Sequence, residues 1–113
     1  MDFSLEELKN EIGLTGYKIN KYCDLLLLGK NEAADSFVSV LSDAFSSIIP
    51  KIISAYSELD CLKDEDSSIW YSQLKRIFEC LKGDDDLKRI DVLKIETVEN
   101  LRILLEALES SDG

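Results

Sequence analysis

Residues 34–59, ADSFVSVLSDAFSSIIPKIISAYSEL, decide the fold. Apolar side chains recur through this stretch every three or four positions, which is the period of one face of an α-helix. They are Ala34, Val38, Leu41, Phe45, Ile48, Ile52, Ala55 and Leu59, with Phe37, Ile49 and Tyr56 beside them. Pro50 removes one backbone hydrogen bond, but the apolar pattern stays in register after it, so we expect a kink and not an end. This helix, capped by Asn31, is predicted to be the centre of an all-α core.

The stretch before it has a well-marked helix start. Ser4 and Glu7 have the spacing of a capping box, in which the serine side chain accepts a backbone N–H. The apolar face then comprises Leu5, Leu8, Ile12, Ile19, Cys23 and Leu26. Gly29 stands where a C-terminal cap is expected, so the first helix is predicted to run from about Leu5 to about Leu28.

Two more helices are predicted after the central one. Asp66 or Ser67 caps a third helix, which Gly83 closes, and the run Asp84–Asp86 supplies the start of a fourth. The expected core faces are Trp70, Leu74, Ile77, Phe78 and Leu81 on the third helix, and Leu87, Ile90, Val98, Leu101, Leu105 and Leu108 on the fourth. Residues 110–113 are expected to fray.

The fold class follows from these four segments. The chain has 113 residues, which is the size of one domain, and we expect residues 1–113 to form a single helical domain. Four helices joined by short loops predict an antiparallel up-down four-helix bundle with a Pro-kinked second helix.

Composition excludes several function classes. Asp and Glu number 23 against 13 Lys and Arg, a formal net charge of -10, which argues against binding to nucleic acid or to an anionic membrane surface. The chain has no His, so Ser-His-Asp and Cys-His nucleophiles and His-containing zinc sites are excluded. The acidic runs Asp64–Asp66 and Asp84–Asp86 lack the spacing of an EF-hand loop. We therefore expect no enzyme activity, metal or cofactor.

Cellular location is predicted from the cysteines and the N-terminus. Cys23, Cys61 and Cys80 are odd in number and widely spaced, which is typical of reduced thiols. The N-terminal residues lack the features of a signal peptide, and no apolar run reaches the length of a membrane span. These observations favour a cytoplasmic protein.

Apolar residues off the expected core faces are the candidate interface. By helical spacing, Leu14, Tyr17, Leu25 and Leu28 lie opposite the core face of the first helix, and Val92, Ile95 and Ile103 opposite that of the fourth. Contiguous exposed apolar surface typically marks contact with a partner or a second copy, so a homodimer is one alternative. The other alternative is that the stripes are buried, either broadly among the four helices or because the fourth helix is rotated.

Seven serines gather mainly on the outer side of the central helix. They are Ser36, Ser39, Ser42, Ser46, Ser47, Ser54 and Ser57. Serine is a mediocre helix former, so a row of serines is an unusual choice for a helix surface. The row either leaves a shallow surface that another helix can approach closely, or is a tolerated exposed face.

Two short motifs carry a family resemblance. The stretch 85–96, DDLKRIDVLKIE, and the stretch 29–33, GKNEA, resemble motifs of a family of small uncharacterised acidic helical proteins of Firmicutes, a domain of unknown function. The resemblance spans about residues 17–108, and Ile95 replaces the aromatic residue that the family has before the final Glu. It implies no activity, but it marks Asp85, Asp91 and Glu96 as candidate polar positions. Asp91 is expected either to cap a helix or pair with Lys94 or Arg102, or, as the favoured alternative, to lie solvated on the surface.

The expected function is therefore non-enzymatic. The sequence favours a cytoplasmic protein-interaction module that uses the fourth helix and the outer face of the first, and its acidic surface favours a basic protein partner. The alternatives are a small export-type chaperone, and an acidic inhibitor or immunity protein that covers a basic site on its partner.

Overall fold

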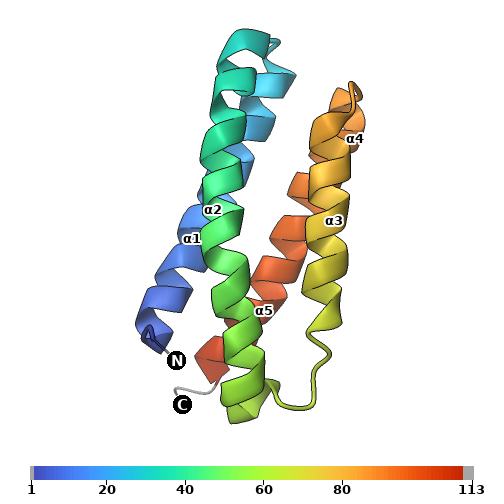
Figure 1. The fold of residues 1–113 in the computed structure, drawn as a ribbon. Coiled ribbons are helices and arrows are strands. Elements are labelled where there is room, and N and C mark those ends of the chain that lie inside the picture. Colours follow the sequence, from blue (N-terminus) through green and yellow to red (C-terminus); the bar gives the residue numbers. More distant parts are fainter. Residues whose placement is uncertain (1, 111–113) are drawn as a thin grey trace.

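The computed structural model describes residues 2–110 and is an antiparallel four-helix bundle (Figure 1). The helices are α1 (Leu5–Leu27), α2 (Asn31–Glu58) and α3 (Ser68–Lys82), with a short 3₁₀ turn, η1 (Asp60–Leu62), after α2. The fourth rod consists of α4 (Asp86–Ile90), a π-helical segment, η2 (Asp91–Thr97), and α5 (Val98–Ser110), which follow one another without a break. The described residues contain no β-strand. The predicted all-α class is confirmed.

The rods alternate in direction around the bundle. Figure 1 shows the first and last described residues at the same end, with α1 and α3 running one way and α2 and the fourth rod the other. α1 packs along α2 on one side and along η2 and α5 on the other, and α3 packs against α2, α4 and η2. The bundle measures 43 × 22 × 21 Å. Each rod therefore has two neighbours, and the core lies between all four.

Helix ends are fixed by the capping residues that the sequence offers. Oγ of Ser4 accepts the N–H of Glu7 at 3.1 Å, as the capping box predicts. Gly29 has φ +72, and the N–H groups of Gly29 and Lys30 donate to the carbonyls of Leu26 and Leu25, which is the Schellman arrangement. Asn31 is not a cap: α2 begins at Asn31, and the preceding residue, Lys30, makes no side-chain cap.

The later helix starts use aspartates. Oδ1 of Asp66 accepts the N–H of Ser68 at 2.9 Å, although Ser67 occupies the N-cap position of α3 without using its side chain. Asp85 caps α4 by accepting the N–H of Lys88 at 3.1 Å. Fraying was expected for residues 110–113. Of these, Ser110 is the last residue of α5, and residues 111–113 lie outside the described residues.

The core is built around the predicted face of α2. Leu41, Phe45, Ile48 and Ile52 are buried there, and they meet Leu8, Ile19 and Tyr22 of α1 and Trp70 and Ile77 of α3. The indole Nε1 of Trp70 donates to the hydroxyl of Tyr56 at 2.9 Å, so the polar edge of this large side chain is satisfied. α2 continues through Pro50 to Glu58, as the unbroken apolar register predicts.

The fourth rod differs from the prediction in the phase of its core face. Val92 and Leu93 are buried, whereas Leu87, which was predicted to face the core, is 77 % exposed. In the π-helical segment, hydrogen bonds run from residue i to residue i+5, so a turn takes one residue more than in an α-helix. The core face is therefore carried by Val92, Leu93, Thr97, Leu101, Leu104 and Leu108.

Candidate functional site

The predicted apolar interface is only partly exposed. Its exposed residues are Leu14, Tyr17, Leu28, Ile95 and Ile103. Leu25 is half-buried against the core, and Val92 is buried. The assignment of Val92 to the outer stripe was therefore wrong, because the π-helical segment turns this residue inward.

Three of the exposed residues line separate depressions. Leu14 lines a small depression between α1 and α2, Ile95 lines one on α4 and η2, and Ile103 lines one near η1 and the start of α3. Leu14, Ile95 and Ile103 therefore do not line one shared depression.

The three candidate polar residues have separate roles. Asp85 caps α4, Asp91 is exposed at the start of η2, and Glu96 forms a bidentate ion pair with Arg76 of α3. The two nitrogen-to-oxygen distances of this pair are 2.7 and 2.6 Å. Arg102, which was considered as a partner for Asp91, instead pairs with Glu99 and Glu106 on its own helix.

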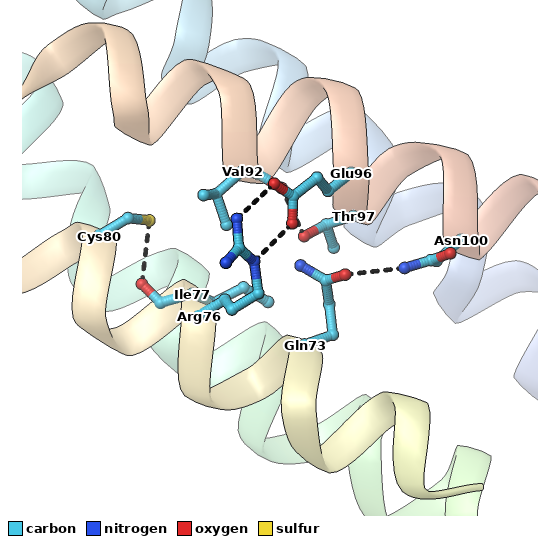
Figure 2. A network of polar contacts seen from close by, with 8 residues as sticks. All are labelled: Gln73, Arg76, Ile77, Cys80, Val92, Glu96, Thr97 and Asn100. Carbon is cyan, nitrogen blue, oxygen red and sulfur yellow. Dashed lines mark hydrogen bonds and ion pairs between the residues drawn. The ribbon is translucent and has the colours of Figure 1, made fainter. Parts of the chain in front are cut away.

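Glu96 belongs to a polar network between α3 and the fourth rod (Figure 2). Next to it, Oε1 of the buried Gln73 accepts a hydrogen bond from Nδ2 of Asn100 at 2.7 Å, and Oγ1 of the buried Thr97 donates to the carbonyl of Val92 at 2.8 Å. Hydrogen bonds from Arg76 hold the pKa of Glu96 below its ordinary value. The network joins α3 to the fourth rod and includes a residue of the π-helical segment that bonds within it.

Arg89 forms a second polar cluster at one end of the bundle. Its side chain is 14 % exposed, and its guanidinium donates to the carbonyls of Cys80, Leu81 and Gly83 at the end of α3. The same group lies 3.4 Å from the hydroxyl of Tyr22 on α1. An Arg guanidinium has five N–H donors in one plane, so it can bond several acceptors at once. Arg89 thereby connects the last turn of α3 to α1 and α4. No spacing pattern in the sequence points to it.

An apolar groove lies between α2 and α3. It has a volume of about 620 Å³. Its lining comprises Phe45, Ser46, Ile49, Pro50, Ile53 and Ser54 from α2 and Tyr71, Leu74 and Phe78 from α3. Tyr71 and Phe78 are 59 % and 39 % exposed. Phe78, which was predicted to face the core, therefore stands on the rim of the groove.

Charges are sparse on the α2 wall of this groove. Between Ala44 and Ser57, α2 carries one charged residue, Lys51, and Nζ of Lys51 lies 2.6 Å from Glu11 on the opposite side, against α1. Pro50 has no N–H, so the carbonyl of Ser46 lacks its usual helical donor at this point. Ser46 and Ser54, two residues of the serine row, line the α2 wall of the groove. In the sequence, the row of serines and Pro50 marked the α2 wall of the groove. Nothing in the sequence marked the α3 wall.

Acidic and cysteine side chains are the candidate reactive groups of the described residues. Within residues 2–110, no group of three or more Cys, Asp or Glu side chains is placed to hold a metal ion. Cys23 and Cys80 are buried and Cys61 is exposed. Burial raises the pKa of the Cys23 thiol to about 11 and also raises that of Cys80, which keeps both thiols protonated at neutral pH.

α2 is a long and apolar helix. By length and composition alone, it is the one described helix that is suited to cross a membrane, a test that core helices of bundles also pass. Only 33 % of its most apolar stretch is buried inside the bundle. Ser46, Pro50 and Ser54 of this helix line the groove.

Comparison with protein-family models, with curated proteins and with solved structures gave no match.

Proposed function

We propose that this chain is a non-enzymatic protein-interaction module, and that its docking surface is the α2–α3 groove. One observation carries the proposal: an open apolar groove of about 620 Å³, edged by exposed Tyr71 and Phe78, on a chain in which 32 % of residues are charged. Aromatic anchors and a scarcity of charge distinguish the centre of protein interfaces from ordinary surface.

The groove suits an apolar helix face. It runs between two helices, and small Ser46 and Ser54 on one wall permit close approach of another backbone. Helices that bind in such grooves insert apolar side chains spaced by three or four residues. The unpaired cysteines accord with the cytoplasm, where we propose that the protein acts.

Among the alternatives, the groove favours a chaperone-like capture of a helix over an acidic inhibitor. An inhibitor would present the carboxylates of Asp84–Asp86 to a basic site. Asp85 already accepts the N–H of Lys88, and Asp86 lies 3.6 Å from Arg89, so two of these acids serve the fold itself. The exposed aromatic side chains at the rim of the groove, Tyr71 and Phe78, are not part of the hydrophobic core.

A dye that fluoresces on apolar surface, anilinonaphthalene sulfonate, tests the accessibility of the groove. We expect the native protein to bind the dye, Phe78→Glu to weaken binding about tenfold, and Ile103→Glu to leave it unchanged. Ile103 is the matched control, because it is an exposed apolar residue outside the groove. Unfolding curves of both variants show that the fold is intact.

A photo-crosslinking amino acid placed at position 71 then tests docking in cells. We expect a discrete protein adduct from this position and none from position 103. Equal adducts at both positions, or dye binding that Phe78→Glu does not alter, would overturn the proposal that the groove is the docking surface.

A further inference from the structure

We propose that the hollow between the end of α2, the start of α3 and α5 binds a small organic amine, that is, a protonated amino group on an apolar body. This hollow is the depression that Ile103 lines, and it shares no lining residue with the α2–α3 groove. The inference therefore goes beyond the proposed function and does not rest on it. The hollow has a volume of about 420 Å³, which is within the range of sites that hold small organic ligands.

The walls of this hollow are mostly apolar. Its apolar lining comprises Leu62, Ile69, Trp70, Ile103, Leu104 and Ala107. Leu62, Trp70 and Leu104 belong to the buried core, so packing holds them in place. Ile69 and Ile103 are 47 % and 52 % exposed, so apolar surface remains open to a ligand. An apolar ligand body is stabilised when it covers this surface, because both surfaces then leave water.

The uncharged polar groups of the lining offer acceptors. Nε1 of Trp70 already donates its one proton to the hydroxyl of Tyr56 at 2.9 Å, and the hydroxyl oxygen keeps a second lone pair. Nδ2 of Asn100 donates to Gln73 at 2.7 Å, and Figure 2 shows the amide oxygen of Asn100 pointing away from Gln73. Oxygen acceptors therefore remain for a ligand, and an ammonium group has three N–H donors and no acceptor.

The charged residues of the lining are both acidic. They are Glu65 and Asp66, and both are exposed. Within residues 2–110, neither carboxylate forms an ion pair with a Lys or Arg side chain. The hydrogen bond from the N–H of Ser68 holds the pKa of Asp66 below its ordinary value, so Asp66 is ionised at neutral pH. The carboxylate of Glu65 has no such task in the fold, and it is the proposed partner of the ammonium group.

The charge of the surroundings also favours a cation. The segment 60–66 carries four acidic residues and one lysine, and the whole chain has a net charge of -10. A negative surface raises the local concentration of cations and repels anions. The hollow is therefore expected to select an amine over a carboxylate that has the same apolar body.

Phenethylamine is the probe that tests the inference. Trp70 is the only tryptophan of the chain and lies in the wall of the hollow, so its indole N–H signal in NMR spectra reports on binding. Titration of the full chain is expected to give a dissociation constant of about 1 mM or less. Phenethyl alcohol, which has the same body without the charge, is expected to bind about tenfold more weakly. Hydrocinnamate, the corresponding anion, is expected to leave the Trp70 signal unmoved.

A pair of variants isolates the charge of Glu65. Glu65→Gln is expected to weaken phenethylamine binding about tenfold and to leave the affinity for phenethyl alcohol unchanged, because only the amine pairs with the carboxylate. Asp64→Asn is the matched control: it removes the same charge one residue away, outside the lining, and is expected to stay within about twofold of the parent.

Three results would each overturn the inference. They are a Trp70 signal that does not move up to about 20 mM phenethylamine, equal affinities for the amine and the alcohol, and equal effects of Glu65→Gln and Asp64→Asn on amine binding. The dye and crosslinking experiments on the α2–α3 groove are independent of all three, so the inference and the proposed function can fail separately.

Discussion

At the scale of single residues, two arginines hold the bundle together in different ways. Arg89 is largely buried and satisfies backbone carbonyls at the end of α3, whereas Arg76 is half-exposed and pairs with one carboxylate across the interface between α3 and η2. Removal of a buried donor leaves its acceptors without a hydrogen bond. Removal of one partner of an exposed ion pair costs less, because water then solvates the other partner. The two residues should therefore differ in their contribution to stability.

Arg89→Ala is expected to lower the free energy of unfolding by about 2–3 kcal/mol, because charged hydrogen bonds to the carbonyls of Cys80 and Leu81 are lost together. Urea unfolding followed by circular dichroism measures the change. Lys88→Ala, one residue earlier and exposed, is the control and is expected to stay within about 0.5 kcal/mol of the parent. Equal losses in the two variants would contradict the role given to Arg89.

The ion pair of Glu96 makes the free energy of unfolding depend on pH. Its pKa in the folded state lies below the ordinary 4.5, chiefly because Arg76 donates hydrogen bonds to it, so the unfolded chain takes up the proton first. The pair stabilises the fold above the unfolded pKa, and this contribution is lost as the pH falls through the folded pKa. Glu96→Gln is expected to cost about 0.5–1 kcal/mol at about pH 7 and nothing at about pH 2.

The control for this experiment is Glu109→Gln, which removes an exposed carboxylate of α5. Chemical unfolding at several pH values gives the difference from the parent for each variant. A Glu96→Gln difference that stays constant from neutral to strongly acid pH would show that the charge of Glu96 is not its cause.

At the scale of elements, helix starts and ends were well predicted, and the face of one rod was not. Ser4, Gly29 and Asp85 act as the local sequence indicates, because a cap depends on residues within one turn. Asn31 failed as a cap because α2 already includes it. The π-helical segment was missed, since an α-helical period was applied to residues that do not follow it.

Thr97 is expected to support the π-helical segment. Its buried hydroxyl donates to the carbonyl of Val92, five residues earlier, and thereby satisfies a main-chain acceptor within this segment. Thr97→Val is expected to cost about 1–2 kcal/mol in urea unfolding, because the shape is kept but the donor is lost. Thr97→Ser keeps the hydroxyl and is expected to recover part of this loss. A valine variant as stable as the parent would contradict this role.

At the scale of the whole molecule, the core shields two of the three thiols. Cys61 is exposed, whereas Cys23 and Cys80 are buried and have raised pKa values. Iodoacetamide at about pH 8 is expected to modify Cys61 at least about 100-fold faster than the other two, because thiolate and access are both required. Mass spectrometry follows the labelling, with urea-unfolded protein as the control. Rapid labelling of Cys23 in the native protein would contradict the packing described for α1.

The all-α class, the helix limits and the central seam of α2 were determined by the sequence, because periodicity and capping are local properties that neighbouring residues carry. The phase of the fourth rod, the clamp made by Arg89 and the α2–α3 groove were decided by tertiary structure. Ser46 and Phe78 are 32 positions apart, and their meeting depends on how α3 docks against α2. Val92 was misplaced for a related reason: one π-helical turn rotates every residue on one side of it relative to those on the other.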